Sequence, residues 1–149
     1  MQLRLARLGG DTSPRLLNAW QAALEKVADL PAQVRVLRVA ARAPSTVSFA
    51  ELQRQVARLT ARAEASEARV RAQTLAELAL LGADQGDAAQ LQAQGRRALT
   101  TPSLTADQQL RLRTQLLGGG HIALAQSAQL AGEPAVAESQ WRLAAQYLL

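Results

Sequence analysis

The stretch 124–145, LAQSAQLAGEPAVAESQWRLAA, repeats the pattern of the stretch 78–99, LALLGADQGDAAQLQAQGRRAL, at a constant offset of 46 residues. Both place Leu-Ala seven or eight residues before a glycine that an acidic residue follows, Gly86 in the first and Gly132 in the second. Both then place Arg ten residues and Ala twelve residues after that glycine. Glycine is the usual residue at the end of a helix that turns into another element. The pattern therefore predicts two helical hairpins of related design.

Helix-start signals and chain breakers extend this prediction along the chain. Cap residues or first-turn prolines stand at Ser13-Pro14, Pro31, Ser48, Asp87, Thr105 and Pro134. Breakers such as Pro44 and the GGG run at 118–120 separate these starts. Together they predict helices at 14–29, 31–43, 48–81, 87–99, 104–117, 121–131 and 134–148. The segment 48–81 is either one long helix or two helices joined near Ala65-Ser66, because its apolar stripe changes phase.

The composition favours the same fold class. Apolar residues make up 48% of the chain but aromatic residues only 3%, so the core must consist of Leu, Ala and Val. Strands favour aromatic and β-branched residues, whereas small side chains suit closely packed helices. We expect an all-α protein of about seven helices, arranged as antiparallel hairpins in a repeat array or as a compact helical bundle.

The stretch 118–149 resembles a tetratricopeptide repeat, a pair of antiparallel helices with small residues where they cross. The matching positions are Ala125 on the first helix, Gly132 in the turn, and Ala137, Trp141 and Ala144 on the second helix. A degenerate copy spans 72–102, where Ala79, Gly86 and Ala98 match. The offset of 46 exceeds the family's period of about 34 by roughly the size of the segment 104–117. We therefore expect a basic N-terminal helical region over 1–65 and a tetratricopeptide-like region over 66–149.

The last predicted helix, 134–148, is apolar on two sides. Ala137, Trp141, Ala144 and Leu148 form one stripe, and Val136, Leu143 and Tyr147 form a second. One stripe would pack on the helix 121–131. The other either binds a separate protein or a second copy of the chain, or is buried where the helix folds back into a compact bundle. The candidate interface residues are Val136, Trp141, Leu143, Tyr147 and Leu148, with Trp141 as the main anchor.

The positive charge is concentrated in the N-terminal half. Of the net charge of +5, residues 1–71 contribute +6 and residues 72–149 contribute −1. Such an asymmetry indicates an acidic partner, and two rows of Arg at helical spacing would follow a phosphate backbone. The candidate residues are Arg35, Arg38, Arg42, Arg54, Arg58, Arg62, Arg69 and Arg71. The alternative is a solvated helix face on which arginines pair with Glu51, Glu64 and Glu67.

Residues 33–82 are also similar to the opening of winged-helix transcriptional regulators. The recognition helix would run from Ser66 to Leu81, with Arg69 and Arg71 near its N-terminal end, where base contacts are usually made. The chain departs from that pattern because no breaker lies between Thr60 and Ser66 and no wing strands follow Gly82. This resemblance implies a DNA-binding regulator whose helical region serves dimerisation or effector binding.

Signals for catalysis, cofactors and membranes are absent from the sequence. The chain has no Cys and a single His, His121, so thiolate chemistry and His-based metal sites are excluded. GGGHIA at 118–123 fits a dinucleotide-loop pattern, but no strand precedes it. No signal peptide and no apolar run of about 18 residues is present. We expect a cytoplasmic, non-catalytic protein-interaction module, a helical scaffold or adaptor without cofactor, metal or small-molecule substrate.

Overall fold

Caps and a first-turn proline begin several helices where the sequence predicts them. Pro31 occupies the first turn of α3 (Leu30–Ala41). The Ser48 hydroxyl accepts a hydrogen bond from the Glu51 backbone N–H at 3.2 Å, one residue before α4 (Phe49–Glu64). Thr105 and Gln108 form a complete capping box at the start of α7 (Ala106–Thr114). These local hydrogen bonds satisfy backbone donors that the first helical turn leaves unpaired.

The computed structural model describes residues 22–26, 29–42 and 47–148, without the side chains of Tyr147 and Leu148. Every regular element in this part of the chain is a helix, which confirms the predicted all-α class. Within the predicted helix 14–29, residues 22–25 are helical, and most of the remainder lies outside the described residues. The chain divides into two compact units, Met1–Arg62 and Ala63–Leu149.

The first unit contains α3 and most of α4, joined by a polar contact. The Arg62 guanidinium on α4 donates a hydrogen bond to the buried Gln33 side chain on α3, at 3.5 Å. Leu37 of α3 and Leu59 of α4 are completely buried. The helix α4 ends at Glu64, and α5 (Ala68–Asp84) begins after a short turn. The predicted segment 48–81 is therefore two helices, joined near Ala65-Ser66.

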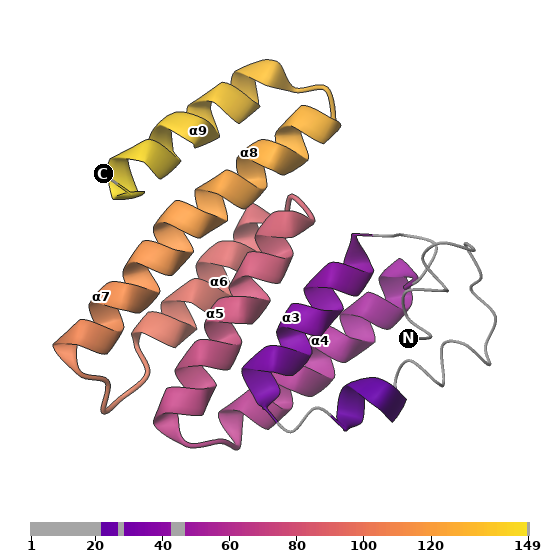
Figure 1. Ribbon diagram of the computed structural model, residues 1–149, viewed down its shortest axis with the longest axis vertical. Coiled ribbons are helices and arrows are strands. Elements are labelled where there is room, and N and C mark those ends of the chain that lie inside the picture. Colours follow the sequence, from indigo (N-terminus) through magenta and orange to yellow (C-terminus); the bar gives the residue numbers. More distant parts are fainter. Residues whose placement is uncertain (1–21, 27–28, 43–46, 149) are drawn as a thin grey trace. The chain divides into compact units, whose positions relative to one another are not determined.

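The second unit is built from two helical hairpins, one of α5 with α6 (Ala88–Leu99) and one of α8 (Gly120–Leu130) with α9 (Pro134–Leu148), as Figure 1 shows. Both hairpins turn through the same hydrogen-bonded motif. Gly86 and Gly132 have φ values of 76° and 75°, and the N–H of the following residue reaches the carbonyl five residues back at 2.8 Å and 2.9 Å. These are Schellman motifs, which end a helix through a left-handed glycine. The two stretches that repeat 46 residues apart in the sequence thus form equivalent turns in the structure.

The small residues that the two repeats have at equivalent positions are buried. Ala79 and Ala125, the first-helix positions of the two repeats, are completely buried. Ala98 and Ala144, the second-helix positions, are buried as well. Short side chains let helix axes approach closely, while leucines of α5 such as Leu75 and Leu78 fill the remaining core.

The expected helix break at the GGG run, 118–120, is wrong. α7 continues through a π-helical segment, η1 (Gln115–Gly119), directly into α8, so the predicted helices 104–117 and 121–131 are one continuous helical stretch. Close packing explains one of the three glycines: a Cβ atom at Gly120 would lie 2.8 Å from a Leu91 methyl group of α6. Gln115 also donates a hydrogen bond to the buried Glu77 carboxylate of α5 at 3.3 Å. Tertiary contacts therefore outweigh the low helix propensity of glycine.

Candidate protein-interaction surface

Of the predicted interface residues on α9, two are substantially exposed. Val136 exposes 47% and Trp141 exposes 37% of its surface, whereas Leu143 is half-buried. The side chains of Tyr147 and Leu148 lie outside the described residues. The two exposed residues lie on opposite flanks of α9, because five residues of an α-helix span 500° of rotation. Val136 and Trp141 thus lie on the two sides of the exposed face of α9 and do not form one apolar patch.

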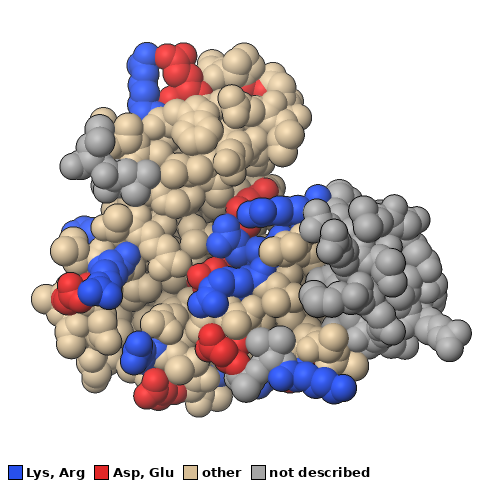
Figure 2. Space-filling view, viewed as in Figure 1, with Lys and Arg blue, Asp and Glu red and all other residues tan. Residues whose placement is uncertain are grey.

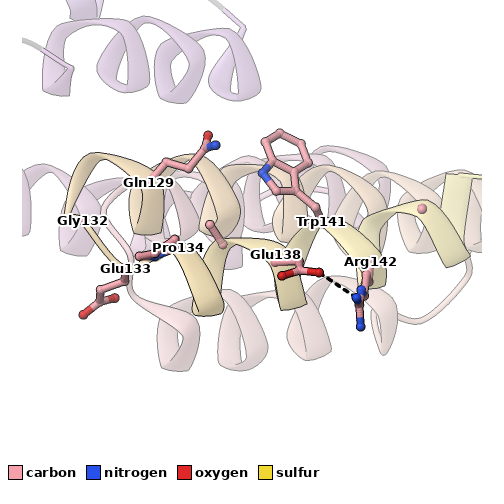
Figure 3. Close-up of a pocket in the computed structure, with 9 residues that line it drawn as sticks. Gln129, Gly132, Glu133, Pro134, Glu138, Trp141 and Arg142 are labelled. Carbon is pink, nitrogen blue, oxygen red and sulfur yellow. Dashed lines mark hydrogen bonds and ion pairs between the residues drawn. The ribbon is translucent and has the colours of Figure 1, made fainter.

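Trp141 lies at the edge of an open groove of about 530 Å³ between the end of α8 and the outer side of α9. Figure 3 shows Gln129 and Trp141 projecting to the same side of the hairpin. The groove is lined by Gln129, the turn residues Gly132, Glu133 and Pro134, and the α9 residues Ala137, Glu138, Trp141, Arg142 and Ala145. Its lining is therefore largely apolar, and its charged members are Glu133, Glu138 and Arg142.

The repeat offset relates this groove to a covered position in the first hairpin. The residue equivalent to Trp141 is Gly95 on α6. A Cβ atom at Gly95 would lie 3.6 Å from both methyl groups of Leu116, which belongs to the following π-helical segment. In the first hairpin the next helix packs on this position, whereas in the second hairpin the position carries a partly exposed Trp.

Charged residues are sparse on the terminal hairpin. Between Gly120 and Leu148 they are limited to Glu133, Glu138 and Arg142. Glu138 and Arg142 form an ion pair at 2.6 Å, with 65% and 76% of their side chains exposed. Figure 2 shows that the surface in the region of α9 is largely uncharged and that its charged side chains occur as an isolated pair. Such a surface loses little hydration free energy when another protein covers it.

The structure adds Leu130, which the sequence analysis did not single out, and shows a contact of His121 that the sequence did not predict. Leu130, the last residue of α8, is 92% exposed. The polar residues Gln126 and Ser127, three and four positions earlier on the same helix face, were the signal for its exposure. His121 is half-buried, and its Nδ1 lies 2.7 Å from the Gln140 side-chain oxygen, which ties α8 to α9.

The arginines of α4 are engaged with neighbouring polar groups. Arg54 forms an ion pair with the buried Glu51 at 2.5 Å, and the Arg58 Nε donates to Gln55 at 2.9 Å. Arg62 contacts Gln33, as described above. In the other row, Arg35 and Arg42 are exposed and Arg38 is half-buried. The pair with Glu51 is the one that the solvated-face interpretation expects, whereas Glu64 pairs with Arg97 of α6.

The segment interpreted as a recognition helix is the most buried helix of the second unit. From Thr74 to Ala83, every residue of α5 is buried. The Arg71 guanidinium donates to the Glu64 and Ser66 carbonyl oxygens, at 3.2 Å and 3.4 Å, and so caps the end of α4. Of the two arginines predicted to contact DNA bases, Arg69 is exposed and Arg71 is not. A helix must present a free face along its length to enter the major groove, so this burial argues against that role.

Arg69 instead lines a second groove of the unit, of about 480 Å³, between the start of α5 and α7. Its other polar residues include Gln73, Asp107, Gln108 and Arg111. Arg111 is paired with Asp107 at 3.0 Å. This groove is more polar than the one beside Trp141, and its charges are partly compensated within α7.

Searches for other kinds of site and for relatives give no match. Within the described ranges, no group of three or more His, Cys, Asp or Glu side chains is arranged to hold a metal ion. None of the helices in that part of the chain combines the length and apolar character needed to cross a membrane. No family model matches the chain, and neither a curated protein nor a solved structure matches it.

Proposed function

We propose that this chain is a non-catalytic protein-interaction module whose binding element is the terminal hairpin α8–α9. The observation that carries the proposal is the partial exposure of Trp141 in an open, largely apolar groove. A large aromatic side chain that is held by one helix and left partly uncovered is a typical anchor of protein interfaces. Trp also adds more apolar contact area than any other side chain.

The comparison of the two hairpins supports a helix as the bound element. At Gly95 the following helical segment packs on α6, and the equivalent site on α9 is the groove beside Trp141. A helix from another molecule would occupy the place that Leu116 and its neighbours occupy in the first hairpin. Apolar faces laid into such grooves are a common mode of protein recognition.

The tetratricopeptide-like assignment is part of this proposal. Two features support it: equivalent Schellman turns 46 residues apart, and buried alanines at the crossing positions of both hairpins. The longer spacing corresponds to α7, which precedes the second hairpin. The cytoplasmic location predicted from the sequence also remains part of the proposal, and fractionation of cells that express the chain would test it.

Site-specific photo-crosslinking tests the proposed surface directly. We would replace Gln129, an exposed residue that lines the groove beside Trp141, by a benzophenone amino acid and irradiate cells that express the variant. The matched control is the same replacement at Leu110, an apolar residue of α7 that is 63% exposed. A discrete protein adduct at position 129 that is absent at position 110 is expected. Equal, diffuse adducts at both positions, or none, would contradict the proposal.

Nucleic-acid binding is the second hypothesis and has less support. Its best remaining feature is the exposure of Arg35 and Arg42, which lie at the two ends of the α3 row. The α4 row has its guanidinium groups engaged with Glu51, Gln55 and Gln33. Contacts to phosphate would have to compete with these interactions, and the salt dependence of binding separates the two hypotheses.

A further inference from the structure

We propose that the partner helix is α9 of a second copy of this chain, packed antiparallel on the outer face of α9. This inference rests on the proposed function, because it names the occupant of the same surface. The outer face consists of Ala135, Glu138, Ser139 and Arg142, which are all exposed. Their spacing of three, one and three residues places them on one side of the helix.

The charge pair on this face is complementary to itself. Glu138 and Arg142 are one turn apart, about 6 Å along the helix axis. In an antiparallel pair centred on the level of Gln140, Glu138 of each copy lies opposite Arg142 of the other. The ion pair that now closes within α9 at 2.6 Å would thus join a network of four charges across a twofold axis. Opposite charges at matching positions set the register and orientation of helix pairs.

The surroundings of the pair suit association between identical copies. A twofold interface uses the same patch on both subunits, so a patch with net charge would repel itself. Apart from Glu138 and Arg142, only Glu133 carries charge between Gly120 and Leu148. Ala135 and Ser139 are small enough to let two helices approach closely, and the Trp141 groove shares Glu138 and Arg142 as rim residues. A helix above these two residues would therefore also cover one side of the indole.

Charge reversal tests this arrangement. We would measure the mass of the full-length chain by light scattering and sedimentation up to about 0.2 mM, a range that detects weak self-association. The wild type is expected to reach twice the 15.9 kDa of one chain. Glu138→Arg alone, or Arg142→Glu alone, places like charges opposite each other twice and should weaken self-association by at least about tenfold. An equimolar mixture of the two variants should restore association as a heterodimer.

Matched controls separate this arrangement from general charge effects. Asp107 and Arg111 form a comparable exposed pair one turn apart on α7. Their reversals, Asp107→Arg and Arg111→Glu, should leave self-association unchanged. The double variant Glu138→Arg/Arg142→Glu, which is again self-complementary, should associate like the wild type. Circular dichroism would verify that each variant keeps its helical content.

Three results would overturn the inference. The first is a wild type that stays monomeric over the whole concentration range. The second is single variants that dimerise as well as the wild type, because the dimer would then use another face. The third is single variants that fail to associate even when mixed, because the antiparallel register would then be wrong. A monomeric wild type together with a specific adduct at position 129 to a different protein would refute the self-pairing and leave the proposed function intact.

Discussion

Substitution of the two neighbouring glycines at the junction of η1 and α8 should change stability in opposite directions. Gly119 and Gly120 both have right-handed helical backbone angles, with φ of −63°. Alanine inside a helix is more favourable than glycine by about 0.5–1 kcal/mol. At Gly119 the added Cβ would lie 3.6 Å from a Leu80 methyl group, an ordinary van der Waals contact. Gly119→Ala should therefore stabilise the chain by up to about 1 kcal/mol.

At Gly120 the same methyl group has no space. It would lie 2.8 Å and 2.9 Å from the two methyl groups of Leu91 and 3.4 Å from its Cγ. Leu91 is buried, so its side chain cannot move into solvent. Overpacking of this kind costs about 1–3 kcal/mol, which outweighs the gain in helix propensity. Gly120→Ala should thus be destabilising by up to about 2 kcal/mol.

Urea unfolding followed by circular dichroism at 222 nm would measure both changes as shifts in the midpoint at constant slope. If Gly120→Ala raised the midpoint as much as Gly119→Ala, the close contact with Leu91 would not exist. If Gly119→Ala lowered the midpoint, glycine would be needed there for a helix break, as the sequence pattern alone predicts.

Three further predictions test other parts of the structure. Gly132→Ala should destabilise the chain by about 1–2 kcal/mol, because φ is 75° and no atom lies within 4 Å of the new Cβ; an unchanged urea midpoint would refute the left-handed turn. Trp141→Ala should cost about 2–3 kcal/mol, less than the 3–5 of a fully buried aromatic residue, because the indole is 37% exposed. A loss under about 1 kcal/mol would mean that the indole makes little contact within its own chain. In fluorescence anisotropy with labelled duplex and single-stranded DNA at about 50 and 200 mM salt, we expect no salt-sensitive binding. Salt-sensitive binding that is lost when Arg35, Arg38 and Arg42 are replaced by Ala would instead establish the nucleic-acid hypothesis.

Local signals predicted the helices well because their causes lie within one turn of the chain. The capping box of Thr105 and Gln108 and the first-turn Pro31 involve residues at most three positions apart. The left-handed glycines of the two turns are equally local. The GGG run failed as a predictor because its effect depends on Leu91, a residue on another helix. Sequence patterns record propensity, and propensity yields to packing where the two conflict.

The candidate site was harder to predict because exposure depends on which neighbours a residue lacks. Trp141 shares its predicted stripe with Ala137 and Ala144, and these two residues are buried whereas Trp141 is 37% exposed. The helical period gives the direction of a side chain around the helix axis only to within about 50°. That uncertainty is large enough that a residue at the edge of the stripe can lie either in the core or beside the groove. Leu130 is 92% exposed although it is apolar, and only the polar residues Gln126 and Ser127 on the same helix face indicate this in the sequence.

The two hairpins share their turns and crossing points, and differ in what lies on the second helix. The turn is constrained by the positive φ of Gly86 and Gly132, and the crossing by side chains no larger than Ala. The residues at the equivalent positions 95 and 141 differ because their neighbours differ. Position 95 is a glycine, where Leu116 packs closely, whereas position 141 is a Trp, whose own side chain must cover the helix. The same physical requirement, to cover the second helix of each hairpin, therefore selects opposite residues at equivalent positions. A helix bound beside Trp141 would meet that requirement for α9 from outside the chain.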